Sequence, residues 1–107
     1  MRITAKHEYA DGTHVIAGEV GLPTPCHLLE TRSIVTKGGQ AVVLEFIAST
    51  QAEACAQVIT PSRFKIELDA DEDAVFSATW NGDRAELNLI PVAEGETLDE
   101  FEIFIKG

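Results

Sequence analysis

The sequence predicts an all-β fold, a two-layer antiparallel β-sandwich of immunoglobulin-like (Ig-like) architecture with about eight or nine short strands. Turn signals such as Asn81-Gly82 recur at short intervals along the chain. The segments between them alternate apolar and polar residues, which is the period of a half-buried strand. No long stretch has the apolar spacing of an amphipathic helix. A small closed β-barrel is the alternative architecture.

The composition indicates one globular domain and argues against several classes of partner. The chain has 107 residues, 45% of them hydrophobic, so we expect a single domain spanning residues 1–107. Eighteen acidic and eight basic residues give a formal net charge of −10. This charge repels phosphate backbones and anionic lipids, so we expect no nucleic-acid partner and no membrane insertion. No apolar run approaches the roughly 18 residues of a membrane-spanning helix.

The first two strands are expected on either side of Asp11-Gly12, a dipeptide that favours a two-residue type I′ turn. In the register that this turn imposes, His7 lies opposite Ile16 and Tyr9 lies opposite His14. Both histidines therefore share one face of the hairpin, in a diagonal arrangement.

Two further hairpins are expected around Gly38-Gly39 and Asn81-Gly82. The first turn places Arg32 opposite Glu45, a favourable cross-strand charge pair. It also gathers apolar residues on the other face, which we expect to point to the core: Leu29, Val35, Val42, Leu44, Phe46 and Ala48. The facing pairs expected in the other hairpin are Ala78 with Ala85, Phe76 with Leu87 and Ala74 with Leu89.

Three more strands are expected at residues 54–60, 63–69 and 100–106. A turn signal at residues 61–62 separates the first two, and the acidic run 69–73 ends the second. The inward-facing residues of the second strand are expected to be Phe64, Ile66 and Leu68.

Two cysteines, Cys26 and Cys55, are present in the sequence. Their spacing is not that of a thioredoxin-like redox site or a zinc knuckle, both of which use Cys-x-x-Cys pairs. A disulfide that closes this loop of about 30 residues would stabilise the fold by roughly 3.5 kcal/mol. We therefore expect a Cys26–Cys55 disulfide and an oxidising compartment. Two buried free thiols in a cytosolic protein are the alternative.

The first ten residues are polar and alternating, and they lack the apolar region of a secretion signal. The residues from Met1 onward already have the pattern of a strand. We therefore expect a leader that has been removed upstream of Met1, and an extracytoplasmic protein in the periplasm or at the cell surface. A cytosolic protein without the disulfide is the alternative.

Two segments around the cysteines resemble a pattern found in a group of bacterial proteins. Residues 23–27 are Pro-Thr-Pro-Cys-His, and residues 55–58 are Cys-Ala-Gln-Val. This pattern is similar to that of small disulfide-bonded Ig-like β-sandwich domains in uncharacterised bacterial extracytoplasmic proteins and lipoproteins. The resemblance covers residues 15–90. It implies that Cys26 pairs with Cys55 and that the domain is exported, and it implies no particular activity.

Two groups of side chains have the chemistry of metal ligands. Asp69, Asp71 and Asp73 occupy positions one, three and five of a calcium-loop pattern. Positions six and twelve need Gly and Glu but carry Ala and Trp, so we expect a solvated acidic turn. His7 and His14 lack the further ligands that zinc needs, and we expect them to be polar residues at the frayed end of a hairpin. The sequence therefore predicts no metal and no cofactor.

Catalytic motifs are missing from the sequence. It has no Gly-x-Ser-x-Gly nucleophile motif, no histidine in a recognisable motif with a serine, and no phosphate-binding glycine-rich loop. We therefore expect that the protein is not an enzyme.

The expected function is binding or structural support by a monomeric, non-catalytic extracytoplasmic domain, with another protein or a surface glycan as the partner. The candidate binding residues are Leu22, Pro23, Thr24, Pro25, Trp80 and Phe104. One alternative is a protease-inhibitor-like β-sandwich that uses residues 22–25 as a wedge. The other is a Ca²⁺- or carbohydrate-binding module that uses the acidic run 69–73.

Overall fold

The structure is a computed structural model, and it describes residues 1–52 and 54–92. Within these residues the chain forms strands and one short 3₁₀ turn, η1. The elements are β1 (Arg2–Ala10), β2 (Thr13–Leu22), β3 (Leu28–Thr36), η1 (Lys37–Gly39), β4 (Ala41–Ser49), β5 (Thr60–Asp69), β6 (Val75–Trp80) and β7 (Asp83–Pro91). The predicted all-β class is confirmed, and the strand expected at residues 100–106 lies outside the described residues.

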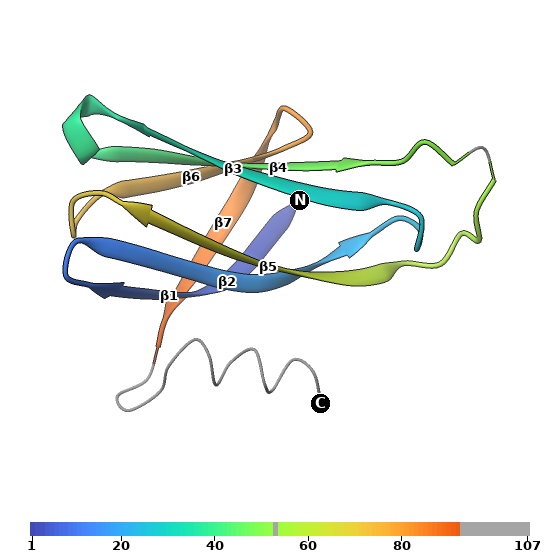
Figure 1. The fold of residues 1–107 in the computed structure, drawn as a ribbon, viewed down its shortest axis with the longest axis horizontal. Coiled ribbons are helices and arrows are strands. Elements are labelled where there is room, and N and C mark those ends of the chain that lie inside the picture. Colours follow the sequence, from blue (N-terminus) through green and yellow to red (C-terminus); the bar gives the residue numbers. More distant parts are fainter. Residues whose placement is uncertain (53, 93–107) are drawn as a thin grey trace.

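The seven described strands form one continuous sheet in the order β3-β4-β6-β7-β1-β2-β5. The β4–β6 and β1–β7 ladders are parallel, and the other ladders are antiparallel. The two terminal strands of this order, β3 and β5, approach each other without forming a ladder (Figure 1). The sheet is therefore nearly closed and barrel-like, and it does not separate into the two stacked layers that the sequence predicts.

The register of the first two hairpins is confirmed. His7 lies opposite Ile16, and in the β3–β4 hairpin Arg32 lies opposite Glu45. In the first turn Asp11 and Gly12 have φ values of 52° and 85°, as a type I′ turn requires. The second turn differs from the expected two-residue turn, because it includes η1, in which all three residues have positive φ.

The third hairpin agrees with the sequence only near its turn. Ala78 lies opposite Ala85 as expected, but the ladder does not extend to Phe76 or Ala74. Beyond Ala85, β7 leaves β6 and pairs in parallel with β1, which places Leu87 beside Ile3. A turn dictates the register of the residues next to it, whereas the choice of a distant partner strand depends on the whole fold.

The strand expected at residues 54–60 and the turn expected at residues 61–62 are both wrong. Residues 54–59 form no regular element, and β5 begins at Thr60 and runs through Pro61. Among the described strands, β5 lies at the end of the order and pairs with β2. Proline is tolerated at such a position because its missing N–H can point away from the ladder.

The core fills the interior of this curved sheet. Phe46 of β4 and Phe64 of β5 meet edge to face, with ring centroids 4.9 Å apart, so strands from opposite halves of the order share one core. Val35 was expected in the core but is 41% exposed, because β3 is a terminal strand in the order of the described strands. The buried hydrophobic cluster consists of Ile3, Ala5, Ile16, Val20, Leu22, Val42, Leu44, Phe46, Phe64, Ile66, Leu68, Ala78 and Ala85.

Candidate functional site

The predicted disulfide is confirmed and organises one end of the molecule. Cys26 and Cys55 are bonded, and their Cα atoms lie 6.3 Å apart. Cys26 precedes β3 and Cys55 precedes β5, so the crosslink joins the two segments that lead into the terminal strands of the sheet. We call the segments 22–28 and 54–59, together with this crosslink, the disulfide end (Figure 1).

Thr24 orders the first segment of the disulfide end. Its side chain is buried, and its hydroxyl oxygen accepts a hydrogen bond from the Cys26 backbone N–H at 3.2 Å. The same hydroxyl lies 2.8 Å from Nδ1 of His27, whose backbone N–H donates to the Thr24 carbonyl. A threonine hydroxyl bonded to the backbone two residues later stabilises a tight local turn. Thr24 therefore holds the loop in shape and is not exposed to a partner.

The other residues of the predicted binding segment are partly buried in the core and partly exposed. Leu22 belongs to the core and is 4% exposed, whereas Pro23 and Pro25 are exposed. Leu22 is therefore not a surface contact residue, because its side chain packs inward from the last position of β2. The protease-inhibitor interpretation loses the leucine of its wedge for the same reason.

Exposed aliphatic side chains are a feature of the disulfide end that the sequence did not reveal. Leu28, Val58 and Ile59 are 75%, 58% and 77% exposed. We call these three residues the aliphatic surface. Sequence reasoning placed Val58 and Ile59 in a strand, where one of them would be covered, and the irregular backbone leaves both uncovered. The Ile59 side chain reaches back to Gly21, where an added Cβ would lie 3.0 Å from Ile59 Cγ2.

A shallow hollow of about 430 Å³ lies beside the crosslink. It is lined by Cys26, Leu28, Ser49, Thr50, Gln51 and Ala52. The hollow thus connects Leu28 with the polar segment that follows β4. Hydroxyl and amide groups beside an exposed leucine can form hydrogen bonds around an apolar contact, the usual composition of a protein–protein contact surface.

Comparisons with known proteins give no family for the chain. A scan against protein-family models matches none, and searches of curated proteins and of solved structures find no match. Across residues 1–52 and 54–92, no helix is long and apolar enough to cross a membrane. The candidate site therefore rests on the geometry of this chain alone.

The aromatic candidates do not join the disulfide end. Trp80 is half-buried at the end of β6, packs against the core, and stacks on Phe46 with a centroid distance of 6.5 Å. Its neighbour Asn81 is tied to β4, since its backbone N–H donates to Phe46 O and its side-chain oxygen accepts from Ala48 N–H. Trp80 therefore closes the core, and Phe104 lies outside the described residues.

The two histidines of the first hairpin meet, as the register predicts, but not at a frayed end. His14 is fully buried, and its ring contacts those of Tyr9 and Phe76. His7 Nε2 lies 2.8 Å from His14 Nδ1, and His14 Nε2 lies 2.7 Å from the carbonyl oxygen of Asp71. A carbonyl only accepts, so His14 Nε2 donates to Asp71, and in the neutral ring His14 Nδ1 accepts from His7.

Burial lowers the pKa of His7 below its ordinary value, and the nearby His14 lowers that pKa further. Protonation of His7 would place a charge on a partly buried ring beside a second imidazole, which is why its pKa is lowered.

The acidic run 69–73 connects neighbouring elements, and its carboxylates do not converge on one point. Asp69 accepts a hydrogen bond from the hydroxyl of Thr13 at 2.8 Å, and the Asp71 backbone N–H donates to Gly39 O at 3.0 Å. Within the described part of the chain, no group of three or more His, Cys, Asp or Glu side chains is placed to hold a metal ion. The turn between β5 and β6 is instead tied to β2 and to the turn between β3 and β4.

Proposed function

We propose that this protein is a non-catalytic, extracytoplasmic binding domain that contacts a partner protein through its disulfide end. The observation that carries the proposal is the combination of a disulfide with exposed aliphatic side chains in the two segments that it joins. Its role would be that of an Ig-like module, in which a rigid β-scaffold presents loops for recognition.

The disulfide supports both the compartment and the mode of binding. Structural disulfides persist in oxidising compartments such as the periplasm or the cell exterior. A crosslink between two loops also limits their motion before a partner arrives, which lowers the entropy that binding must overcome. A surface on such loops is thereby preorganised for contact.

The aliphatic surface favours a protein over a glycan as the partner. Leu28, Val58 and Ile59 expose branched hydrocarbon, which gains free energy when another apolar surface covers it. Sugars present mainly hydroxyl groups, which aliphatic side chains cannot satisfy by hydrogen bonding. The net charge of −10 would favour approach to a partner with a basic surface.

Site-specific photocrosslinking in cells of the source organism tests the binding surface. A photoreactive amino acid at Ile59 should give a discrete protein adduct. The same group at Val75, which is 70% exposed on β6, is the matched control and should give none. Equal adducts at both positions, or none at Ile59, would contradict the proposed surface.

The compartment is tested separately by blocking thiols in intact cells with an alkylating reagent before lysis. We expect the intact mass of the bridged, unmodified chain. A chain carrying two alkyl groups would show that Cys26 and Cys55 are reduced in the cell and would remove the proposal of export.

A further inference from the structure

The two terminal strands of the sheet differ in how well they resist pairing with another chain. Within the described residues, β3 and β5 each have one strand neighbour. β5 contains Pro61 and presents a row of charged side chains, features that discourage pairing at an edge. These exposed charged residues are Arg63, Lys65, Glu67 and Asp69. β3 contains no proline and presents exposed aliphatic residues, so it is the less protected edge.

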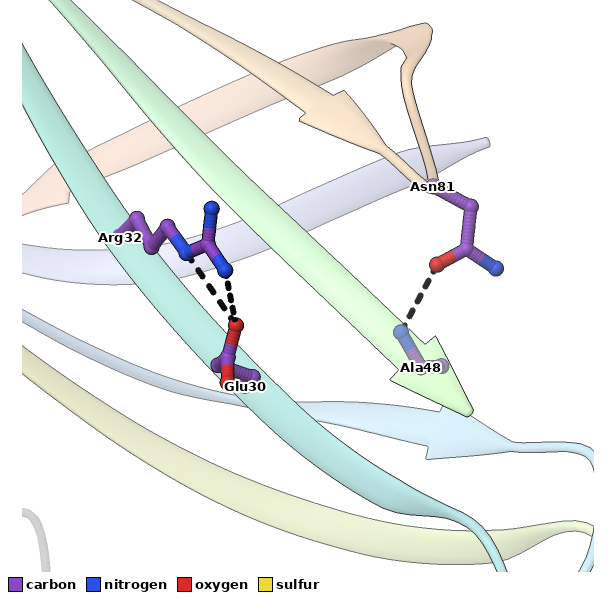
Figure 2. A network of polar contacts seen from close by, with 4 residues as sticks. All are labelled: Glu30, Arg32, Ala48 and Asn81. Carbon is purple, nitrogen blue, oxygen red and sulfur yellow. Dashed lines mark hydrogen bonds and ion pairs between the residues drawn. The ribbon is translucent and has the colours of Figure 1, made fainter. Parts of the chain in front are cut away.

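The outer face of β3 has a regular pattern along Leu28, Glu30, Arg32 and Ile34. Leu28 and Ile34 are exposed, and the side chains of Glu30 and Arg32 are 60% and 62% exposed. Arg32 donates two hydrogen bonds to one carboxylate oxygen of Glu30, at 2.8 and 3.1 Å, on the same strand (Figure 2). An apolar residue thus stands at each end, with one acid and one base between them.

This pattern is complementary to itself when the strand direction is reversed. In an antiparallel pair of two β3 strands centred on Thr31, Leu28 lies opposite Ile34 of the other copy. Glu30 then lies opposite Arg32 of the other copy, so two acid–base pairs form across the twofold axis. We propose that the protein forms a symmetric dimer through antiparallel pairing of β3 with β3 of a second copy.

The backbone and the inner face fit the same register. In this register, even-numbered residues lie opposite even-numbered residues and odd-numbered opposite odd-numbered. The N–H and C=O groups that point away from β4 therefore meet the same groups of the other copy, and side chains stay on corresponding faces. Thr31 lies opposite its own counterpart on the twofold axis, a favourable cross-strand pair, and Leu29 lies opposite Ser33. The dimer would pair backbone groups of β3 that have no ladder partner among the described strands, and it would cover Leu28 and Ile34.

This dimer replaces the expectation of a monomer. It does not rest on the proposed function, but it would cover Leu28 of the aliphatic surface. Because β3 runs away from Cys26, antiparallel pairing directs the two disulfide ends in opposite directions. The exposed residues Val58 and Ile59 of each copy remain outside the paired strands. A dimer would therefore present two partner-binding ends.

Charge reversal on β3, measured by sedimentation equilibrium of the purified, oxidised protein, tests the pairing. Glu30→Arg and Arg32→Glu each place like charges opposite one another twice, so each variant alone should self-associate about tenfold or more weakly than the wild type. An equimolar mixture of the two variants pairs Arg with Glu at both positions and should regain the dimer. The double variant E30R/R32E should also dimerise.

The recovery on mixing separates pairing between chains from an effect within one chain. Loss of the Glu30–Arg32 contact inside one chain cannot be repaired by adding the other variant. Glu67→Arg is the matched control, since it breaks the exposed Lys65–Glu67 contact of the same spacing on β5 and should leave association unchanged. Thermal unfolding of each variant checks that the fold is retained.

Three results would overturn the inference. The wild type could remain monomeric at the highest soluble concentration, the mixture could fail to regain the dimer, or E67R could weaken association as much as E30R does. The last result would place the contact on β5. None of them bears on the crosslinking expected at Ile59, so the proposed function stands or falls separately.

Discussion

At the scale of single residues, His14 shows how a buried polar side chain is accommodated. Both of its ring nitrogens have partners, one on the adjacent strand and one on the backbone of the β5–β6 turn. His7 beside it has a lowered pKa because it is partly buried and faces another imidazole. His7 therefore makes stability depend on pH.

The free energy of unfolding should fall as the pH decreases from about 7.5 to 5.5. The pKa of His7 is lower in the folded state than its unfolded value of about 6.5, so the unfolded state binds protons more readily. The stabilisation is complete above pH 6.5 and is lost as the pH falls through the folded pKa. Urea titrations at several pH values measure this slope. His7→Gln keeps a donor near Nε2 and should flatten it, whereas a slope unchanged by the substitution would exclude His7 as its source.

Asn81 combines two functions in one turn residue. It has a φ of 50°, and its backbone N–H ties the β6–β7 turn to Phe46 of β4. Its side chain ties the turn to Ala48 of the same strand (Figure 2). Asn81→Ala should destabilise the fold by about 1–3 kcal/mol, because it loses a hydrogen bond and a residue suited to positive φ. Asp11→Ala is the control, since Asp11 also has a positive φ of 52°. Similar losses for both variants in chemical denaturation would show that the Asn81–Ala48 hydrogen bond contributes little.

At the scale of elements, local signals predicted hairpins well and distant pairing poorly. Asp11-Gly12 and the residues before Ala41 dictated registers that the structure reproduces. The parallel pairing of β1 with β7 and of β4 with β6 was not predictable, because no turn connects the two strands of either pair. The alternation of apolar and polar residues in each strand would also suit several other partner strands. Pro61 was expected in a turn because sequence alone does not distinguish a proline in an edge strand from a proline in a turn.

The candidate site was predictable to a similar degree. The two cysteines follow from composition and spacing, and the meeting of the two histidines follows from the first register. The burial of Leu22 and the exposure of Ile59 did not follow, because both depend on where β2 ends and β5 begins. Element boundaries are set by tertiary contacts as much as by local sequence.

The close packing of β1, β2 and β5 can be tested at Gly18. A Cβ added there would lie 2.8 Å from the Thr4 carbonyl oxygen and 3.0 Å from the ring of Phe64. Gly18→Ala should therefore destabilise the protein by about 1–3 kcal/mol, since backbone or core must move. Gly21→Ala is the control, because its added methyl would meet only the exposed side chain of Ile59. Equal midpoints for the two variants in urea unfolding would contradict this account.

At the scale of the whole molecule, the disulfide joins the segments that lead into the two ends of the sheet. The strand order is held by ladders everywhere except between β3 and β5, and the Cys26–Cys55 bond lies next to that gap. The crosslink thus links the segments beside β3 and β5, between which no hydrogen-bonded ladder forms. It also spans a long stretch of sequence, with a separation of 29 residues.

Removal of the disulfide should lower the free energy of unfolding by about 3.5 kcal/mol. The double substitution of Cys26 and Cys55 by Ser tests this in urea titrations, with the oxidised and chemically reduced wild type measured beside it. The reduced wild type should behave like the double variant. A loss below about 1 kcal/mol would mean that the bond contributes little to folding and would leave it a role in shaping the loops alone.

The parallel ladder of β1 with β7 has a consequence for how the polypeptide acquires its shape during synthesis. Arg2 pairs beside Glu86, so β1 cannot complete this ladder until β7, the last strand that the structure describes, has been synthesised. Hairpins can close early, but the described sheet cannot be completed until β7 is available. For the export that we propose, such delayed completion would leave the sheet open while the chain is threaded through a translocation pore.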